Sequence, residues 1–212
     1  MNRFLVAVAV AAMPLVSVAQ TNLVANGSFE NYAQANQSWS IYNSGSDWTT
    51  GAAGLEIRNA VVGTAADGKN FAELDTTQNS SIYQDINTVV GQEYVLTFSY
   101  SNRTGVAVGS NGLGWSFGDL SGSTPVLAYN STGNNVWNTF SVTLTATSTL
   151  TRLSFSAQGT SDSYGSSLDN IQVVTADGQP AVTSVPEPAT AGLMLLGLGA
   201  LAAARRRRPQ KA

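Results

Sequence analysis

A strict alternation of large apolar and smaller side chains is the sequence feature that most constrains the fold. It is clearest between Glu93 and Asn102, where every second residue is aromatic or leucine, namely Tyr94, Leu96, Phe98 and Tyr100. Successive side chains of a β-strand point to opposite faces, so this period of two predicts a half-buried strand. The alternation recurs at Phe140 to Ala146, Leu153 to Ala157, Ile171 to Val173 and, more weakly, Leu55 to Ala60, Asn70 to Asp75 and Ser80 to Asn87.

These segments together predict an all-β domain. About eight to ten short strands are separated by turn sequences such as Asp67-Gly68 and Asn111-Gly112, and nothing before the C-terminal tail has helical periodicity. We therefore expect a two-sheet jelly-roll sandwich over residues 20–175 and a polar linker over residues 176–185.

The absence of cysteine and histidine excludes several classes of function. Disulfides, thiol nucleophiles, Ser-His-Asp triads and the usual zinc, iron and copper ligand sets all require one of these residues. Between Gln20 and Val185 the chain has four basic residues against twelve acidic ones, a net charge of −8. We expect no nucleic-acid partner because such a surface repels phosphate backbones, whereas divalent cations and neutral polysaccharides suit it.

The end of the chain has the organisation of a sorting signal. A Pro186-Glu187-Pro188 turn precedes an apolar stretch over residues 189–204, and a basic tail over residues 205–212 follows. The tail begins with Arg205, Arg206, Arg207 and Arg208. As a helix the apolar stretch would measure roughly 24 Å, so it is a marginal transmembrane helix. The arginines should stay in the cytoplasm, which predicts export of everything before Pro186.

These three parts, in this order, resemble the tails of PEP-CTERM proteins of Gram-negative bacteria. The resemblance implies that an exosortase, a membrane transpeptidase, recognises Pro186, Glu187 and Pro188 and processes the chain near them. It also implies transient anchoring in the inner membrane, followed by release or transfer to the cell envelope or extracellular matrix. The alternatives are an ordinary tail anchor and a buried core helix.

The N-terminus predicts export independently. Arg3 supplies a positive charge, Phe4 to Val16 form an apolar stretch, and Ser17-Val18-Ala19 offers the small residues that precede cleavage. We expect residues 1–19 to be a signal peptide helix that signal peptidase removes. The alternative, a retained membrane helix, is disfavoured by the short apolar stretch and by Pro14.

Three motifs lie between the two signals. They are NLVANGSFE from Asn22 to Glu30, DGKNFAELD from Asp67 to Asp75 with Ile82 to Gln84 after it, and DSYGSSLDNI from Asp162 to Ile171. In this order they resemble the galactose-binding-like jelly rolls, a family that includes many carbohydrate-binding modules and plant cell-wall proteins. The resemblance extends through most of residues 22–174.

The resemblance also implies a structural calcium ion. In such jelly rolls the first and last strands are neighbours, and an acidic side chain from each region often holds calcium; Glu30 and Asp169 match those positions. Calcium takes six to eight oxygen ligands, so carbonyls of Asn26 or Ser28 and water would have to complete the site. The alternative is that both carboxylates accept backbone N–H bonds in turns.

Aromatic and polar side chains near loop ends are candidates for a carbohydrate site, because sugar rings present C–H patches to aromatics and hydroxyls to polar groups. The candidates are Trp48, Arg103, Trp115, Asp162 and Tyr164. The alternatives are core packing for the two tryptophans and a surface ion pair between Arg103 and Asp162.

Catalysis has little support in the sequence. Glu73 and Asp75 could act as paired carboxylates, but Ala72 and Leu74 between and beside them indicate ordinary placement at a sheet edge. We therefore expect a non-enzymatic exported surface or matrix protein that binds carbohydrate or exopolysaccharide through its jelly roll. The alternative is a structural protein of the biofilm or envelope matrix with no specific ligand.

Overall fold

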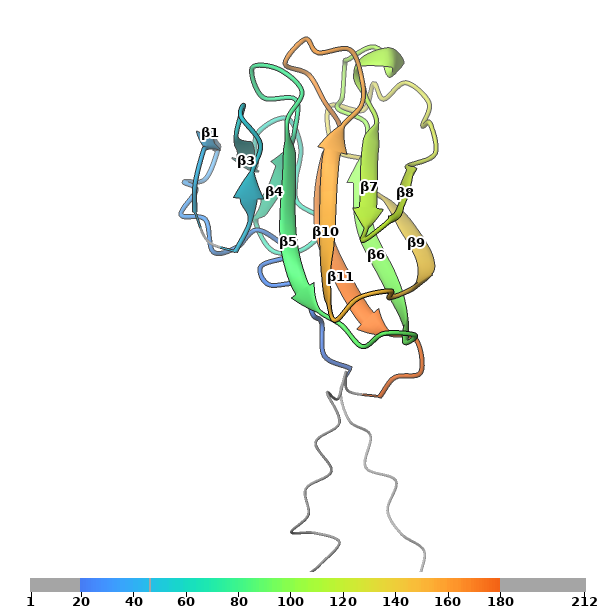
Figure 1. Cartoon of the computed structure of the whole chain (residues 1–212). Helices are drawn as coiled ribbons and strands as arrows, with labels where there is room; N and C mark the ends of the chain where they lie inside the picture. The colour runs from blue at the N-terminus through green and yellow to red at the C-terminus, as the bar shows by residue number, and fades with distance from the viewer. Residues whose placement is uncertain (1–19, 46, 180–212) are drawn as a thin grey trace, which may run out of the picture. The chain divides into compact units, whose positions relative to one another are not determined.

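The computed structural model describes residues 20–45 and 47–179, which form a sandwich of two antiparallel sheets (Figure 1). The six-stranded sheet has the order β1-β3-β4-β11-β6-β9 and consists of β1 (Ser38–Tyr42), β3 (Leu55–Asn59), β4 (Asn70–Glu73), β11 (Ser167–Thr175), β6 (Glu93–Ser101) and β9 (Asn138–Thr145). The five-stranded sheet has the order β2-β5-β10-β7-β8 and consists of β2 (Thr49–Thr50), β5 (Ser81–Asn87), β10 (Leu150–Ala157), β7 (Leu113–Phe117) and β8 (Leu120–Ser123). A single 3-10 turn of the described residues, Val108–Ser110, precedes β7. The predicted all-β, two-sheet sandwich is confirmed.

The hydrophobic core lies between the sheets, and the alternating residues supply it. The apolar positions predicted for β6 are all buried, from Tyr94 to Tyr100. Phe98 of β6 meets Phe155 of β10 in the facing sheet, with ring centroids 5.0 Å apart. Each fully buried side chain of this size contributes about 1.5–3 kcal/mol relative to exposure, so this pattern is the main source of stability.

Residues 22–27 run beside β11 and bring the two ends of the domain together. The N–H of Leu23 donates to the Val173 carbonyl at 2.8 Å, and the N–H of Ile171 donates to the Gly27 carbonyl at 2.9 Å. A Cβ at Gly27 would lie 2.0 Å from the Ile171 oxygen, so only glycine fits this approach. The first and last segments are therefore neighbours, although the first is not a regular strand.

The six-stranded sheet carries charged residues on the face turned away from the core, which we call the outer face. In β3, Leu55 and Ile57 belong to the core cluster, so Glu56 and Arg58 point to the outer face. Trp39 of β1 pairs directly with Arg58 in the antiparallel register and therefore shares that face.

Two loops cover part of the outer face. In the loop over residues 60–69, the N–H of Ala66 donates to Asp169 Oδ2 at 2.7 Å. A second loop, over residues 124–137, joins the first where Trp137 Nε1 donates to the Thr64 carbonyl at 2.9 Å. Because of these loops, every residue of β3 and β4 is buried although only one side of each strand faces the core.

The sequence pattern missed four short strands, β1, β2, β7 and β8. The expected edge placement of Glu73 and Asp75 is wrong, because β4 lies between β3 and β11 and both carboxylates are buried. The predicted signal peptide helix and the sorting tail lie outside the described residues. Within residues 20–45 and 47–179, no helix has the length and apolar character needed to cross a membrane.

Candidate functional site

A pocket of about 290 Å³ lies on the outer face, at the β1 and β3 end of the six-stranded sheet. Its wall consists of Trp39, Glu56, Arg58, Val62, Thr76, Arg103, Ser163 and Tyr164. The strands β1 and β3 contribute the first three of these residues, and loops following β3, β4 and β6 and preceding β11 contribute the others. Segments far apart in the sequence therefore meet at this pocket.

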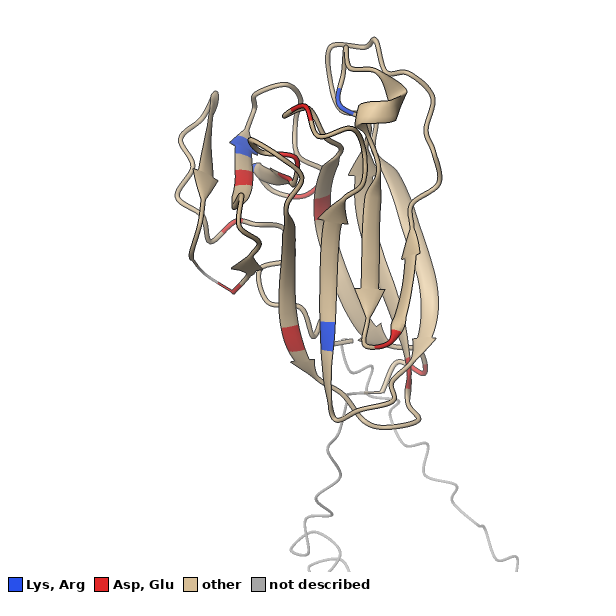
Figure 2. Ribbon diagram, turned by 45° about the horizontal axis from the view of Figure 1, so that its top comes forward, with Lys and Arg blue, Asp and Glu red and all other residues tan. Residues whose placement is uncertain are grey.

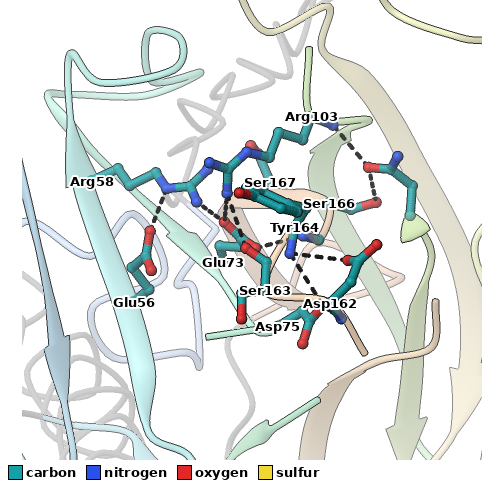
Figure 3. A network of polar contacts seen from close by, with 12 residues as sticks. Glu56, Arg58, Glu73, Asp75, Arg103, Asp162, Ser163, Tyr164, Ser166 and Ser167 are labelled. Atoms are coloured by element: carbon teal, nitrogen blue, oxygen red, sulfur yellow. Dashed lines mark hydrogen bonds and ion pairs between the residues drawn. The ribbon is translucent and has the colours of Figure 1, made fainter. Parts of the chain in front are cut away.

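Four charged side chains form a connected network at the pocket (Figure 3). Arg58 Nε donates to Glu56 Oε1 at 2.6 Å, and Arg58 Nη2 pairs with Glu73 Oε2. Arg103 Nη1 donates to the same Glu73 oxygen at 2.9 Å, so this buried carboxylate bridges two arginines. Burial lowers the pKa of Arg58 to about 10 and also lowers the pKa of Arg103.

One guanidinium nitrogen of Arg58 makes no hydrogen bond within this network. The residue is only 2% exposed, and its Nη1 atom has no hydrogen-bond partner among the described residues. A buried N–H group without an acceptor costs about 1–3 kcal/mol, and more when it carries charge. An oxygen atom supplied by a ligand or by water would remove this cost.

The loop that precedes β11 is held by two buried carboxylates. Asp75 Oδ2 accepts the N–H groups of Asp162 at 3.0 Å and of Tyr164 at 3.2 Å. Glu73 Oε1 accepts the N–H of Gly165 at 2.5 Å. These bonds hold the backbone of the loop that carries Tyr164 beside the pocket.

Two exposed aromatic rings lie in the pocket wall. Tyr164 is 48% exposed, and the Arg103 guanidinium carbon lies 4.6 Å from the centre of its ring. Trp39 is 54% exposed. Val62 and Ser163, also in the wall, have φ angles of 60° and 68°, and such left-handed backbone is rare for residues other than glycine and is common at binding sites.

Charged residues are sparse along the strands, as Figure 2 shows. Ion pairs between strand residues of the described structure occur at Glu56 and Arg58 within β3, at Arg58 and Glu73 across β3 and β4, and at Asp85 and Arg152 across β5 and β10. The pair of Asp85 and Arg152 is exposed, with Arg152 Nε 2.7 Å from Asp85 Oδ1, whereas the two pairs that involve Arg58 are buried beside the pocket. A surface pair of this kind contributes little to stability.

The structure brings three of the five predicted ligand residues together. Arg103 and Tyr164 line the pocket, and Asp162 lies in the adjoining loop. The alternative ion pair between Arg103 and Asp162 is not formed. Arg103 pairs with Glu73 instead, and Asp162 Oδ2 accepts a hydrogen bond from Ser110 Oγ at 2.6 Å.

The other two candidates, Trp48 and Trp115, pack inside the domain. Trp48 is 2% exposed, its ring lies against Phe29 and Phe155, and its Nε1 donates to the Asn26 carbonyl at 3.1 Å. Trp115 is half-buried against the core, with its ring centre 5.6 Å from that of Phe140. Trp48 therefore has no free face for a sugar ring, which matches the alternative of core packing and not the role of a ligand platform.

Sequence reasoning missed Trp39, Glu56 and Arg58 as pocket residues. The stretch Ser38–Tyr42 alternates weakly, so it gave no strand signal. In β3 the apolar and charged residues do alternate, but that pattern indicates a charged face in water. Trp39 pairs with Arg58 across two strands, and loops from other parts of the chain lie over them. Such long-range contacts leave no pattern in the local sequence.

The two acidic residues expected to hold calcium both accept backbone hydrogen bonds. Glu30 Oε1 accepts the N–H groups of Lys69 and Asn70, each at 2.7 Å. Asp169 Oδ2 accepts those of Ala66 and Asp67, at 2.7 and 3.0 Å. The carboxylates thus clamp the two ends of the Asp67-Gly68 turn.

These contacts correspond to the alternative considered for Glu30 and Asp169, and calcium binding stays a prediction. Within the described residues there is no group of three or more acidic side chains placed to hold a metal ion. Glu30 Oε1 and Asp169 Oδ2 each accept two backbone N–H groups. The observed donor set therefore does not fit a calcium site built on these oxygens.

Several solved structures are similar to this chain. A carbohydrate-binding module, TmCBM61, in complex with β-1,4-galactotriose is 15% identical, with a TM-score of 0.48 over 72% of this chain and 97% of the module. A family 35 carbohydrate binding module from Clostridium thermocellum is 18% identical, with a TM-score of 0.43 over 64% of this chain and 97% of that module.

Among curated proteins, the chain is 28% identical over 177 residues to the multifunctional-autoprocessing repeats-in-toxin protein of Vibrio cholerae. A similar match, 28% over 172 residues, is found with the protein of the same name from Vibrio vulnificus. These matches cover 82% and 80% of this chain. The chain spans only 4% and 3% of the length of these relatives.

Two family models match the chain. The PEP-CTERM protein-sorting motif matches residues 184–208, which confirms the sorting signal predicted from the Pro-Glu-Pro turn, the apolar stretch and the arginines. The model described as a protein of unknown function, DUF642, matches residues 22–174. Because this second match spans most of the chain, the protein belongs to the DUF642 family and carries a PEP-CTERM sorting motif at its end.

Proposed function

We propose that the protein is an exported carbohydrate-binding protein that holds its ligand in the pocket of Trp39, Arg58, Arg103 and Tyr164. The observation that carries this proposal is that Arg58 lines a pocket with two exposed aromatic rings, while its buried Nη1 lacks a partner among the described residues. A sugar supplies both missing contacts, because its hydroxyl oxygens accept hydrogen bonds and its C–H patches pack on aromatic rings.

Another pocket, of about 310 Å³, supports a binding role less well. It lies between β6 and the 124–137 loop and is lined by uncharged residues, among them Tyr129. None of its lining side chains has a buried polar atom without a partner. A ligand in this second pocket would therefore find no buried polar atom that still needs a hydrogen-bond partner.

The role we propose is binding without catalysis. Hydrolysis of a glycosidic bond by paired carboxylates needs two acidic groups that flank the bond. In the part of the chain that the structure describes, Glu56 is the only acidic residue in the pocket wall. Glu73 lies behind the two arginines with no exposed surface.

The ends of the chain support a route for delivering this domain. We propose that signal peptidase removes residues 1–19 and that an exosortase recognises Pro186, Glu187 and Pro188, with Arg205 to Arg208 holding the tail in the cytoplasm. The apolar stretch then anchors the chain in the inner membrane for a time. Processing then transfers the domain to the cell envelope or extracellular matrix, where we propose that it binds polysaccharide.

A glycan array probed with the full-length protein in detergent tests the binding role. We compare wild type with Tyr164→Ala, and use Tyr129→Ala as the matched control because Tyr129 is a similarly exposed tyrosine, 56%, beside the other pocket. We expect the wild type to bind at least one glycan. Its affinity should fall about tenfold or more in Tyr164→Ala and stay unchanged in the Tyr129→Ala control.

The outcomes separate this proposal from its alternatives. A blank array with folded protein would contradict it and favour a structural matrix protein without a ligand. Loss of binding in Tyr129→Ala alone would place the ligand in the other pocket. Release of shortened glycans during the incubation would indicate an enzyme.

A further inference from the structure

The pocket wall contains two side chains, Arg58 and Glu56, that each have a hydrogen-bonding atom without a partner among the described residues. The donor is Arg58 Nη1, since Nε and Nη2 of the same guanidinium are already bound to Glu56 and Glu73. The acceptor is Glu56 Oε2: the other Glu56 oxygen binds Arg58, whereas Oε2 accepts no hydrogen bond from the described residues and is not sealed from the surface. Glu56 and Arg58 both belong to β3, and both residues line the pocket.

This pairing favours a hydroxyl group over an anion. A hydroxyl oxygen accepts one hydrogen bond and donates another, so one hydroxyl, or two on neighbouring carbons, can satisfy both Arg58 and Glu56. A carboxylate or sulfate has acceptors only and would place negative charge against Glu56. Contact between the Glu56 carboxylate and a negatively charged ligand group, with no proton between them, is strongly unfavourable in a partly buried site.

The surrounding charges reinforce the same preference. Two arginines, Arg58 and Arg103, face four acidic residues, which are Glu56, Glu73, Asp75 and Asp162 (Figure 3). The neighbourhood therefore has a formal charge of −2, and the exported part of the chain is acidic as a whole. An anionic ligand would meet a site whose positive charges are already more than balanced.

From these contacts we infer that the pocket selects an uncharged sugar residue with two adjacent free hydroxyls. Its hydroxyls bind Arg58 Nη1 and Glu56 Oε2, and its ring packs on Tyr164 or Trp39. Sugars that carry a carboxylate, sulfate or phosphate at this position are rejected. The inference rests on the proposed carbohydrate-binding function and narrows it to a class of ligand.

The Glu56→Gln variant tests the inference because it keeps the shape of the side chain and removes its charge. Isothermal titration of the full-length protein would use the best neutral glycan found on the array and an oligosaccharide of the same length containing uronic acid. A neutral ligand loses a hydrogen bond to a charged acceptor, so we expect Glu56→Gln to weaken its binding by about 10- to 100-fold. An anionic ligand would instead bind Glu56→Gln more tightly than wild type, and that result would overturn the inference.

Two further measurements keep the test decisive. Asp85→Asn, at the exposed pair on β5 and β10, removes one acidic charge far from the pocket wall and should leave the affinity unchanged. If Glu56→Gln does not fold, the salt dependence of wild-type binding distinguishes the two kinds of ligand. The affinity for a neutral ligand should be equal at 50 mM and 500 mM salt, whereas the affinity for an anionic ligand should change. Tight, salt-sensitive binding of the uronic-acid glycan would refute the preference for a neutral sugar but not the carbohydrate-binding function. Binding of no glycan would refute both the preference and the function.

Discussion

Replacing Glu73 with glutamine should destabilise the protein more than any other single loss of charge in the described domain. Glu73 has no exposed surface and receives Arg58 Nη2, Arg103 Nη1 and the N–H of Gly165. Glutamine has the same volume but no charge, so Glu73→Gln leaves two partly or fully buried guanidinium groups without their shared carboxylate. Removing one partner of a buried ion pair costs about 3–5 kcal/mol. In a domain of this size that free energy lowers the melting temperature by about 6–20 °C.

Urea unfolding followed by circular dichroism measures this effect. The matched control is Asp85→Asn, because Asp85 also pairs with an arginine but on the surface, and its loss should leave the free energy of unfolding nearly unchanged. If Glu73→Gln were as stable as the Asp85→Asn control, the Glu73 carboxylate would not be holding Arg58 and Arg103 in place, and this reasoning would be refuted.

Three other measurements test separate parts of the structure. Burial raises the pKa of Asp169 from 3.8 to about 7, so the folded state binds a proton at this carboxyl more tightly than the unfolded state does. Proton binding therefore stabilises the fold by up to about 4 kcal/mol below about pH 4, and this stabilisation is lost as the pH rises through 7. Urea titrations at pH 5 and pH 8 should therefore show lower stability at pH 8, and a higher stability at pH 8 would refute the effect of burial. The backbone bonds to Glu30 and Asp169 predict a melting temperature that does not change with a chelator, whereas a fall would support calcium at these residues. The mass of the protein recovered from cells should correspond to an end near Pro186, and a mature chain that retains Ala212 would contradict exosortase processing.

The strands that the sequence predicted are those whose apolar residues face the core on one side only. In β6 and β10 the period of two follows directly from one buried and one less buried face, so residues such as Phe98 and Phe155 could be assigned correctly. The short strands β7 and β8 contain Gly114 and Gly122 and lack this signal.

The pocket could be predicted only in part. Arg103 and Tyr164 lie beside turn sequences, where exposed functional side chains are expected, and the structure places both in the wall. Arg58 alternates with apolar neighbours in β3, a pattern that normally indicates a solvent-facing charge. Its burial results from loops that arrive from distant parts of the chain, and no local pattern encodes that coverage.

The most direct test of the account is a crystal structure of the protein with its best neutral glycan. We expect a sugar in the pocket of the outer face, with a hydroxyl oxygen within about 2.7–3.2 Å of Arg58 Nη1 and the ring packed on Tyr164 or Trp39. A sugar bound beside Tyr129, or a bound glycan that leaves Arg58 Nη1 without an acceptor, would contradict it.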